Sequence, residues 1–161
     1  MAEYIPSALD LVCEQVELYE GSGGTEGTLR KGVPCIIVTH IGVKTGGIRK
    51  IPLIRVTVDK SYVLIGSYAG SPQHPVWVYN LRANPDVEIR DGTEVFKMRV
   101  REVVNDPERQ RLWDTSTKAY PPYTEYQSKT SRQIPVFVAE PVTVGLEHRP
   151  NNRSAKICYG R

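Results

Sequence analysis

The chain has 161 residues, of which 40% are apolar and 24% are charged, and its formal net charge is +3. This size and composition are typical of one soluble globular domain and exclude a disordered chain. No apolar run approaches the roughly 18 residues of a membrane-spanning helix, and the first residues lack a secretory signal pattern. We therefore expect a cytoplasmic protein.

Positive charge is concentrated in the middle of the chain. Residues 1–29 contain six acidic side chains and no Lys or Arg, whereas residues 30–101 contain twelve basic and five acidic side chains, a net charge of +7. The three cysteines are far apart, and no cluster of Cys and His has the spacing of a metal site. The composition therefore favours an anionic ligand for the middle of the chain and predicts neither a metal site nor a disulfide framework.

The first 29 residues predict an amphipathic helix followed by a glycine-rich linker. Apolar residues recur with helical spacing between residues 5 and 20, and Gly21 ends the pattern. The opposite face is acidic, whereas helices that lie on membranes usually carry Lys and Arg there. We expect this helix to dock on the domain or on a partner, and membrane contact has little support. The apolar stripe consists of Ile5, Leu9, Val12, Val16 and Tyr19.

Strand patterns dominate the chain after this linker. Asp91-Gly92 is a strong signal for a tight hairpin between two of the expected strands. In the strand after this turn, Phe96, Met98 and Val100 are expected to face the core. Short connections between most strands favour an antiparallel barrel over a doubly wound sheet. The six expected strands span residues 33–41, 50–58, 62–68, 86–90, 94–104 and 136–144.

Two helices are expected to interrupt the strands. One spans residues 74–85 and stops near Asn84-Pro85, and the other opens at Asp106-Pro107. The barrel domain is therefore expected to span residues 30–144. Residues 145–161 show no periodicity, and we expect a mobile tail there.

A basic loop with two adjacent glycines joins the first two expected strands. The stretch VKTGGIRKIPLIRV, residues 43–56, places Lys44, Arg49, Lys50 and Arg55 within twelve positions. Glycine lets the backbone approach a ligand closely, and an Arg side chain can grip a carboxylate or phosphate through two N–H groups. The loop is not a phosphate-binding P-loop. An anion site and an ordinary solvated turn both remain open.

The stretch GSYAGSPQHPVWVYNLRANP, residues 66–85, is a second candidate site. It leaves a strand end and enters a helix, where free N–H groups can bind a phosphate or a carbonyl-rich ring. Trp77 and Asn80 lie one helical turn apart. The alternative is a plain connection in which Trp77 belongs to the core.

Three tyrosines recur at intervals of three residues in AYPPYTEYQ: Tyr120, Tyr123 and Tyr126. Each phenol hydroxyl needs a hydrogen-bond partner when it is buried, so such a stripe can line a pocket with polar tips. A packing stripe is the alternative.

His40, His74 and His148 have no evident catalytic partner in the sequence. The shortage of acid, base and nucleophile patterns indicates that a cofactor supplies the chemistry.

Together, these motifs resemble those of the deazaflavin-dependent nitroreductase family of actinobacteria. The shared pattern is KTG..RK.PL, then GS..G.P.HP.W..NL.ANP.V, then the three tyrosines before IPV.V.EP, and it covers about residues 30–142. The resemblance implies a mainly β protein with flanking helices, an antiparallel six-stranded split β-barrel related to FMN-binding oxidases. It implies coenzyme F-420, an 8-hydroxy-5-deazaflavin, as the hydride donor, and a quinone or a nitroaromatic or nitroimidazole compound as the acceptor.

Carried over by position, the resemblance also implies the site residues. Lys44, Thr45, Arg49 and Lys50 would hold the acidic polyglutamyl and phosphate tail of the coenzyme. Ile51, Pro52 and Leu53 would lie along the edge of the deazaflavin ring. Ser67, Tyr68, Ala69, Gly70 and Ser71, with Trp77, Asn80 and Leu81, would close around the ring and its phospholactyl chain. Tyr120, Tyr123 and Tyr126 would form the substrate side, and these three with Ser67 are the catalytic candidates. No metal ligand is implied.

The chain departs from the family pattern in two places. Its acidic first helix poorly matches the membrane-associating N-terminus expected of quinone-reducing members, and Tyr68 stands where many members have a small residue. Two rivals stay open: an FMN-dependent oxidoreductase on the same barrel, and a non-catalytic module that binds a cofactor or lipid. Nucleic-acid binding is not expected, because no RRM or KH signature is present. The physiological acceptor and the oligomeric state are left open.

Overall fold

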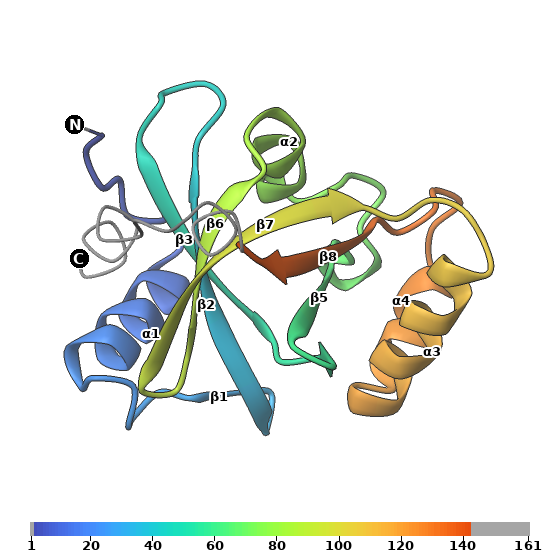
Figure 1. The fold of residues 1–161 in the computed structure, drawn as a ribbon, viewed down its shortest axis with the longest axis horizontal. Helices are drawn as coiled ribbons and strands as arrows, with labels where there is room; N and C mark the ends of the chain where they lie inside the picture. The colour runs from blue at the N-terminus through green and yellow to red at the C-terminus, as the bar shows by residue number, and fades with distance from the viewer. Residues whose placement is uncertain (1, 143–161) are drawn as a thin grey trace, which may run out of the picture.

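A curled antiparallel sheet forms the body of the protein (Figure 1). The computed structural model describes residues 2–142. The sheet has the strand order β1-β2-β6-β7-β8-β5-β4. Strand β3 lies outside this order and pairs with residues 35–41 of β2. The strands are β1 (Leu29–Arg30), β2 (Val33–Ile41), β3 (Ile48–Ile54), β4 (Thr57–Val58), β5 (Ser61–Ile65), β6 (Asp86–Asp91), β7 (Glu94–Glu102) and β8 (Val136–Pro141).

This topology is a split β-barrel with flanking helices, as predicted. The six long strands match the six expected ones, the two-residue strand β1 is an addition, and the two-residue strand β4 is the end of the strand expected at 50–58. The strand expected at 50–58 is divided because the chain changes partner: β3 pairs with β2, whereas Thr57 in β4 faces Tyr62 in β5. This change of partner brings the β2–β3 hairpin next to β5 and curls the sheet.

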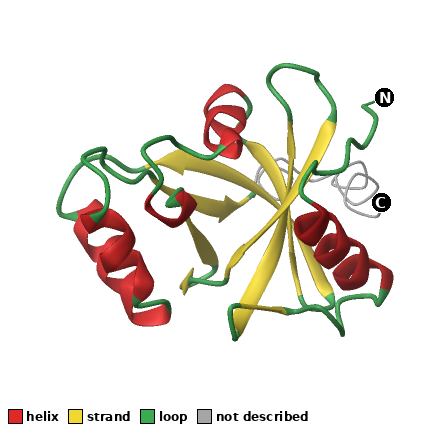
Figure 2. Cartoon of the chain, turned by 180° about the vertical axis from the view of Figure 1, so that it is seen from behind, coloured by secondary structure: helices red, strands yellow, loops and turns green. Residues whose placement is uncertain are grey.

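The helices cover different parts of the barrel (Figures 1 and 2). Helix α1 (Asp10–Gly21) lies at one end of the molecule, and α3 (Glu108–Ala119) with α4 (Pro122–Ser128) lies at the other. Between them, a short 3-10 turn, η1 (Tyr68–Gly70), precedes α2 (Val76–Ala83). No helix within residues 2–142 combines the length and the apolar character needed to cross a membrane. The expected tail, residues 145–161, lies outside the described residues.

The barrel interior is filled by alternating side chains of the strands and by one face of α2. Ile36 and Val38 of β2 pack with Trp77 of α2 and with residues of β6, β7 and β8. Burial of one large aliphatic side chain stabilises a fold by roughly 1.5–3 kcal/mol, so this cluster is a main source of stability. The inward direction of Met98 and Val100 is confirmed. The prediction for Phe96 is wrong: its side chain is 36% exposed, because it lies toward the β6–β7 turn.

Helix α1 begins later than predicted. Residues 3–5 are extended because they pair with β3: the Ile5 N–H donates to Ile48 O at 2.8 Å, and the Ile48 N–H donates to Glu3 O at 2.8 Å. Leu9, predicted for the buried stripe, therefore precedes the helix and is 63% exposed. Val12, Val16 and Tyr19 are buried as predicted, and they pack on Cys35 and Ile37 of β2.

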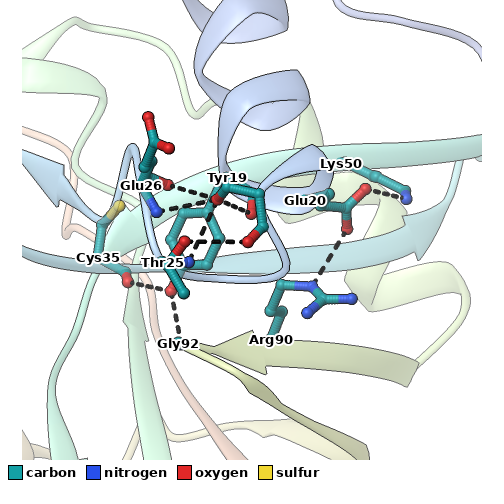
Figure 3. A network of polar contacts seen from close by, with 9 residues as sticks. Tyr19, Glu20, Thr25, Glu26, Cys35, Lys50, Arg90 and Gly92 are labelled. Atoms are coloured by element: carbon teal, nitrogen blue, oxygen red, sulfur yellow. Dashed lines mark hydrogen bonds and ion pairs between the residues drawn. The ribbon is translucent and has the colours of Figure 1, made fainter.

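The Tyr19 hydroxyl fixes the end of α1 to two other elements (Figure 3). It donates a hydrogen bond to Cys35 O at 2.9 Å and accepts one from the Gly92 N–H at 2.8 Å. The loop after α1 also approaches the β6–β7 turn closely, since a Cβ atom on Gly24 would lie 1.8 Å from Gly92 O. Helix α1 is therefore an integral layer of this fold.

Candidate functional site

Strand alternation sends the two neighbouring cations of β3 to opposite faces of the sheet. Arg49 faces His40 across the β2–β3 ladder, and Lys50 faces Thr39. Arg49 thus shares a face with Ile51 and Leu53, which pack against the core cluster that contains α2. Lys50 lies on the face that α1 covers. The structure therefore separates Lys50 from the other cations of the predicted tail site.

Lys50 is engaged by α1. Its Nζ atom lies 2.5 Å from Glu20 Oε1 and 5.2 Å from the centre of the Tyr4 ring (Figure 3 shows the ion pair). Arg90 Nε lies 3.9 Å from the other oxygen of the same carboxylate. The Glu20 carboxylate thus lies near cations of β3 and β6, and the Lys50 ion pair joins α1 to the sheet.

The loop between β2 and β3 is ordered and rests on α2. Asn80 is 4% exposed, and its Oδ1 atom accepts a hydrogen bond from the Val43 N–H at 2.9 Å. Thr45 accepts one from the Gly47 N–H at 3.1 Å, so both polar side chains stabilise the loop itself. Gly46 has φ = 72°, a left-handed conformation that favours glycine. The chain therefore forms an ordered turn here, and residues 43–46 of this turn are exposed to solvent.

Arg49 and Lys44 carry charges that no protein group neutralises within residues 2–142. Neither side chain has an ion pair or hydrogen bond to another described residue, and the Lys44 side chain is exposed at the loop tip. A Cβ atom on Gly42 would lie 3.4 Å from Arg49 Cγ, so the Arg49 stem passes directly over the loop backbone. The α2 face of β3 and the adjoining loop thus carry one cation each that is not neutralised by a described residue.

The turn at η1 is conformationally strained. Tyr68 has φ = 46° and Ala69 has φ = 53°, which are unusual for residues with a Cβ atom, and Gly70 follows with φ = 81°. Each such non-glycine conformation costs on the order of 1 kcal/mol and persists only where surrounding contacts enforce it. Strain of this kind is frequent at ligand-binding sites.

This turn also exposes a row of backbone donors. Ser67 is in the right-handed region, and Tyr68 in the left-handed one, a sequence that directs successive N–H groups into one concavity. The N–H groups of Ser67, Tyr68 and Ala69 have no acceptor within the described residues, whereas those of Gly70 and Ser71 donate to Ser67 O and Tyr68 O at 2.9 Å. Three adjacent free donors form a site for an anionic oxygen.

Arg132 holds this turn from behind and is the residue that the sequence reasoning missed. Its Nε donates to Ser71 O at 2.8 Å, its Nη1 to Gly66 O at 3.2 Å, and its Nη2 to Ser67 O at 2.7 Å. Nη1 also lies 2.8 Å from His74 Nδ1, which therefore acts as the acceptor. Burial, followed by the nearby Arg132 charge, lowers the pKa of His74, so the ring stays neutral at neutral pH. No sequence motif pointed to Arg132.

Helix α2 connects the basic loop and the strained turn. Asn80 binds the loop, and Val78 packs against Gly66, where a Cβ atom would lie 2.7 Å from Val78 Cγ2. The structure therefore brings the two candidate stretches of the sequence together around one helix. Trp77 and Leu81 are 6% and 1% exposed and belong to the core cluster inside the barrel.

The three tyrosines form an aromatic cluster and not a uniform wall. Tyr123 is 4% exposed and belongs to the core beneath α3 and α4, and Tyr120 is also buried. Burial, and then the hydrogen bond to Tyr126, raise the pKa of Tyr120 to about 12. The Tyr120 and Tyr126 hydroxyls are 3.2 Å apart. Only Tyr126 is half-exposed, so the packing interpretation holds for two of the three residues.

Tyr126 lies next to the strained turn. A Cβ atom on Gly70 would lie 2.8 Å from Tyr126 O, so η1 packs directly on α4. Tyr68 is 56% exposed on the same turn. The contact between η1 and α4 therefore brings a tyrosine of each element, Tyr68 and Tyr126, into the neighbourhood of the turn. Of the residues predicted for the ring edge, Pro52 is buried, and Ile51 and Leu53 are half-buried.

Two open hollows lie outside the turn and α4, and the second borders the β2–β3 hairpin at Ile41 and Ile48. One, of about 500 Å³, is lined by residues such as Arg55, Tyr62 and Phe96, and the other, of about 600 Å³, by residues such as His40, Asp86 and Met98. Neither contains a residue of the turn or of α4. Residues 2–142 contain no group of three or more metal-ligating side chains.

The fold and the site define a split-barrel protein with a cationic loop and an N–H-rich turn on either side of one helix. A family described as F420H(2)-dependent quinone reductase matches residues 11–141. The F420H(2)-dependent quinone reductase Rv1261c of Mycobacterium tuberculosis is 38% identical over 124 residues, which are 75% of this chain and 83% of that protein.

Two solved structures are also similar. One, described as an F420-H2 dependent reductase (FDR-A), is 42% identical, with a TM-score of 0.63, over 66% of this chain and 94% of its own. Another, described as a domain-swapped dimer, is 41% identical, with a TM-score of 0.66, over 83% of this chain and 100% of its own. The chain belongs to the F420H(2)-dependent quinone reductase family, which confirms the predicted enzyme class.

Membership of this family implies coenzyme F-420 as the cofactor, as predicted. The residues present fit such a group. Its acidic tail needs cations that are not already neutralised, and Lys44 and Arg49 meet that condition. A phosphate needs converging donors, and the free N–H groups of 67–69 supply them.

Proposed function

We propose that this enzyme transfers hydride from reduced coenzyme F-420 to a quinone, and that the coenzyme binds along α2 between the basic loop and the strained turn. The observation that supports this most directly is the pair of unneutralised cations, Arg49 on the α2 face of β3 and Lys44 in the adjoining loop, which α2 holds through the hydrogen bond from the Val43 N–H to Asn80 Oδ1. The free donors of residues 67–69 stand at the other side of the helix. The site is thus complementary to a long anionic ligand.

When bound, the reduced coenzyme supplies a hydride from C5 of its ring. The chain's own residues then have three tasks. Lys44 and Arg49 bind the carboxylates of the tail. Ile51 and Leu53, half-buried beside the core, offer apolar surface to the flat ring. The turn binds an oxygen of the chain that links ring and tail.

The acceptor is proposed to bind beside Tyr126 and Tyr68. A planar quinone can stack on an aromatic side chain, and a phenol hydroxyl can donate to the quinone oxygen that gains charge. The linked hydroxyls of Tyr126 and Tyr120 provide this donor. Burial keeps Tyr120 protonated at neutral pH, since its pKa is about 12. A nitroaromatic or nitroimidazole acceptor presents the same flat shape and anionic oxygens, and we propose it as the alternative substrate.

Binding of oxidised coenzyme F-420, FMN and NADPH to the same sample tests this function. We expect the deazaflavin to bind most tightly, because the cationic loop can contact its polyglutamyl tail and FMN has no such tail. Turnover of the reduced coenzyme with menadione, and then with a nitroimidazole, ranks the acceptors. Tighter binding of FMN would support the flavin rival, and tight deazaflavin binding without turnover would support a non-catalytic module.

The role of Tyr126 can be separated from that of the buried tyrosines. Tyr126→Phe removes the hydroxyl at the half-exposed position, and Tyr123→Phe removes one from the core as the matched control. We expect Tyr126→Phe to lower the turnover number by up to ~10²-fold, the scale of a preorganised donor to a developing charge, with little change in coenzyme affinity. Equal turnover in the parent and Tyr126→Phe would exclude this hydroxyl as the donor.

A further inference from the structure

Arg132 makes four hydrogen bonds to the segment that precedes α2. Three go to the backbone carbonyls of Gly66, Ser67 and Ser71, and one goes to the His74 ring. A guanidinium group is planar and carries five N–H donors in a fixed arrangement, so this set of bonds defines the position of the whole turn. A Lys side chain has no such planar fork and cannot reproduce it.

The carbonyls that Arg132 holds determine where the free N–H groups point. In a trans peptide, the C=O of one residue and the N–H of the next lie on opposite sides of the same rigid plane. Because Gly66 O points at Arg132, the Ser67 N–H points away from it. Because Ser67 O points at Arg132, the Tyr68 N–H also points away. Arg132 therefore directs two of the three free donors toward the opposite side of the turn.

The same contacts account for the strain in this segment. Tyr68 and Ala69 adopt left-handed conformations that they would otherwise avoid. The Arg132 bonds to Ser67 O and Ser71 O lie on the two sides of these residues. Arg132 thus contributes to enforcing the conformation that makes the donors converge.

We propose that Arg132 is a positioning residue for the coenzyme, which aims the Ser67 and Tyr68 N–H groups at the coenzyme's phosphate. This inference rests on the proposed function. It assigns separate anion sites to the two stretches: the cationic loop takes the tail carboxylates, and the N–H-rich turn takes the phosphate. Arg132 itself points to the back of the turn and is not expected to touch the ligand.

Binding titrations with two ligands test this assignment. The ligands are full coenzyme F-420 and the deazaflavin riboside, which has the same ring but neither phosphate nor tail. For Arg132→Lys, we expect the Kd of the full coenzyme to rise about tenfold and the Kd of the riboside to stay within twofold. The matched control is Arg101→Lys, because Arg101 bonds to the carboxylates of Glu108 and Glu140 and makes no hydrogen bond to the turn. This control should change neither affinity.

Each outcome decides a different point. If the parent does not bind the full coenzyme, the proposed function is wrong and this inference with it. If the parent binds and Arg132→Lys binds equally well, only the role of Arg132 is overturned. An equal loss of affinity for both ligands would also overturn the role of Arg132, because the substitution would then affect binding of the ring or the stability of the whole fold.

Backbone amide signals of the parent protein give a readout that needs no variant to fold. Addition of the full coenzyme should shift the Ser67 and Tyr68 amide proton resonances downfield, as expected for N–H groups that donate to an anionic oxygen. The riboside should leave them in place. Unchanged signals with the full coenzyme would overturn the phosphate assignment.

Discussion

The two faces of strand β3 differ in whether their cationic side chains have acidic partners. On the α1 face, Lys50 is paired with Glu20, which also lies near Arg90. Arg49 on the α2 face and Lys44 in the adjoining loop have no acidic partner within residues 2–142. Lys44, Arg49 and Lys50 are neighbours in one short basic stretch, yet of these three only Lys50 is paired with a described carboxylate. Charge that the fold leaves unneutralised is the charge available to an anionic ligand.

The two faces also differ in what surrounds these charges. The α1 face is bound by the Tyr19 hydroxyl, the Gly24–Gly92 approach and the extended residues 3–5. The α2 face instead leads to three free N–H groups on a strained turn. We infer that the first face provides stability and the second provides binding. Each prediction below tests one side of this division.

The largest effect is expected when both unneutralised cations, Lys44 and Arg49, are removed. Lys44→Ala with Arg49→Ala should weaken coenzyme binding by about 100-fold at low salt, since charge-assisted contacts contribute roughly 1.5–3 kcal/mol each before solvent screening. The loss should shrink as salt is added and grow with the length of the polyglutamyl tail. Titration at two salt concentrations measures both trends. The free energy of unfolding should stay unchanged, and unchanged affinity would remove the proposed tail site.

The next largest effect concerns His40, the cross-strand neighbour of Arg49. Burial lowers the pKa of His40 from 6.5 to about 4, and the ring lies 3.3 Å from Val38 O through Nδ1. The unfolded state therefore binds more protons between these two values, and stability falls as the pH falls through that window. From pH 7 to pH 5, the loss should be about 2 kcal/mol.

His40→Asn provides the control for this pH dependence. The Asn amide can donate to the same carbonyl and does not titrate, so the variant should lose less stability between pH 7 and pH 5. Urea denaturation of both proteins at the two pH values measures the difference. Equal slopes would show that His40 is not the titrating group, and that other residues cause the acid sensitivity.

Removal of one hydroxyl tests the stabilising role of the α1 face. Tyr19→Phe leaves Cys35 O and the Gly92 N–H without their shared partner, and unsatisfied buried groups cost about 1–3 kcal/mol. We expect the free energy of unfolding to fall by about 1–2 kcal/mol. Coenzyme affinity should remain within twofold, because the hydroxyl serves the opposite face from the ligand. A selective loss of affinity at unchanged stability would contradict the division.

Much of the fold could be predicted because its signals are local. The apolar, β-branched run of β2, the alternation in β7 and the Asp91-Gly92 turn are each encoded within a few residues, and they lead to six long strands in an antiparallel barrel. The start of α1 could not be predicted in this way. Ile5 matches the helical spacing, but pairing with Ile48 holds residues 3–5 extended, and that pairing joins segments more than forty residues apart.

The site was predictable as two stretches of sequence but not as a geometry. The spacing of Arg49 and Lys50 showed two adjacent cations, and only the ladder with β2 and the position of Glu20 show that they serve different faces. The tyrosine spacing likewise could not separate the buried Tyr123 from the half-exposed Tyr126. Arg132 was missed because its role depends on carbonyls about sixty residues away in the chain.

The smallest effects should come from the ion pair on the α1 face. Lys50 and Glu20 are each about one quarter exposed, so their pair is partly screened. Lys50→Gln should lower the free energy of unfolding by less than about 1 kcal/mol, since exposed pairs rarely contribute more and Arg90 remains near the carboxylate. It should leave coenzyme affinity within twofold at low and high salt, in contrast to the Lys44 and Arg49 variant.

Glu20→Gln makes this test more stringent, because it frees Lys50 without removing it. If Lys50 could reach the coenzyme tail, loss of its carboxylate partner would release a cation for the ligand, and affinity would rise at low salt. If Lys50 serves only the α1 face, Glu20→Gln should lower stability slightly and leave affinity unchanged. Titration of both variants with the same coenzyme separates these outcomes. A rise in affinity for Glu20→Gln together with a fall for Lys50→Gln would return Lys50 to the binding site, and the two faces of β3 would then share one ligand.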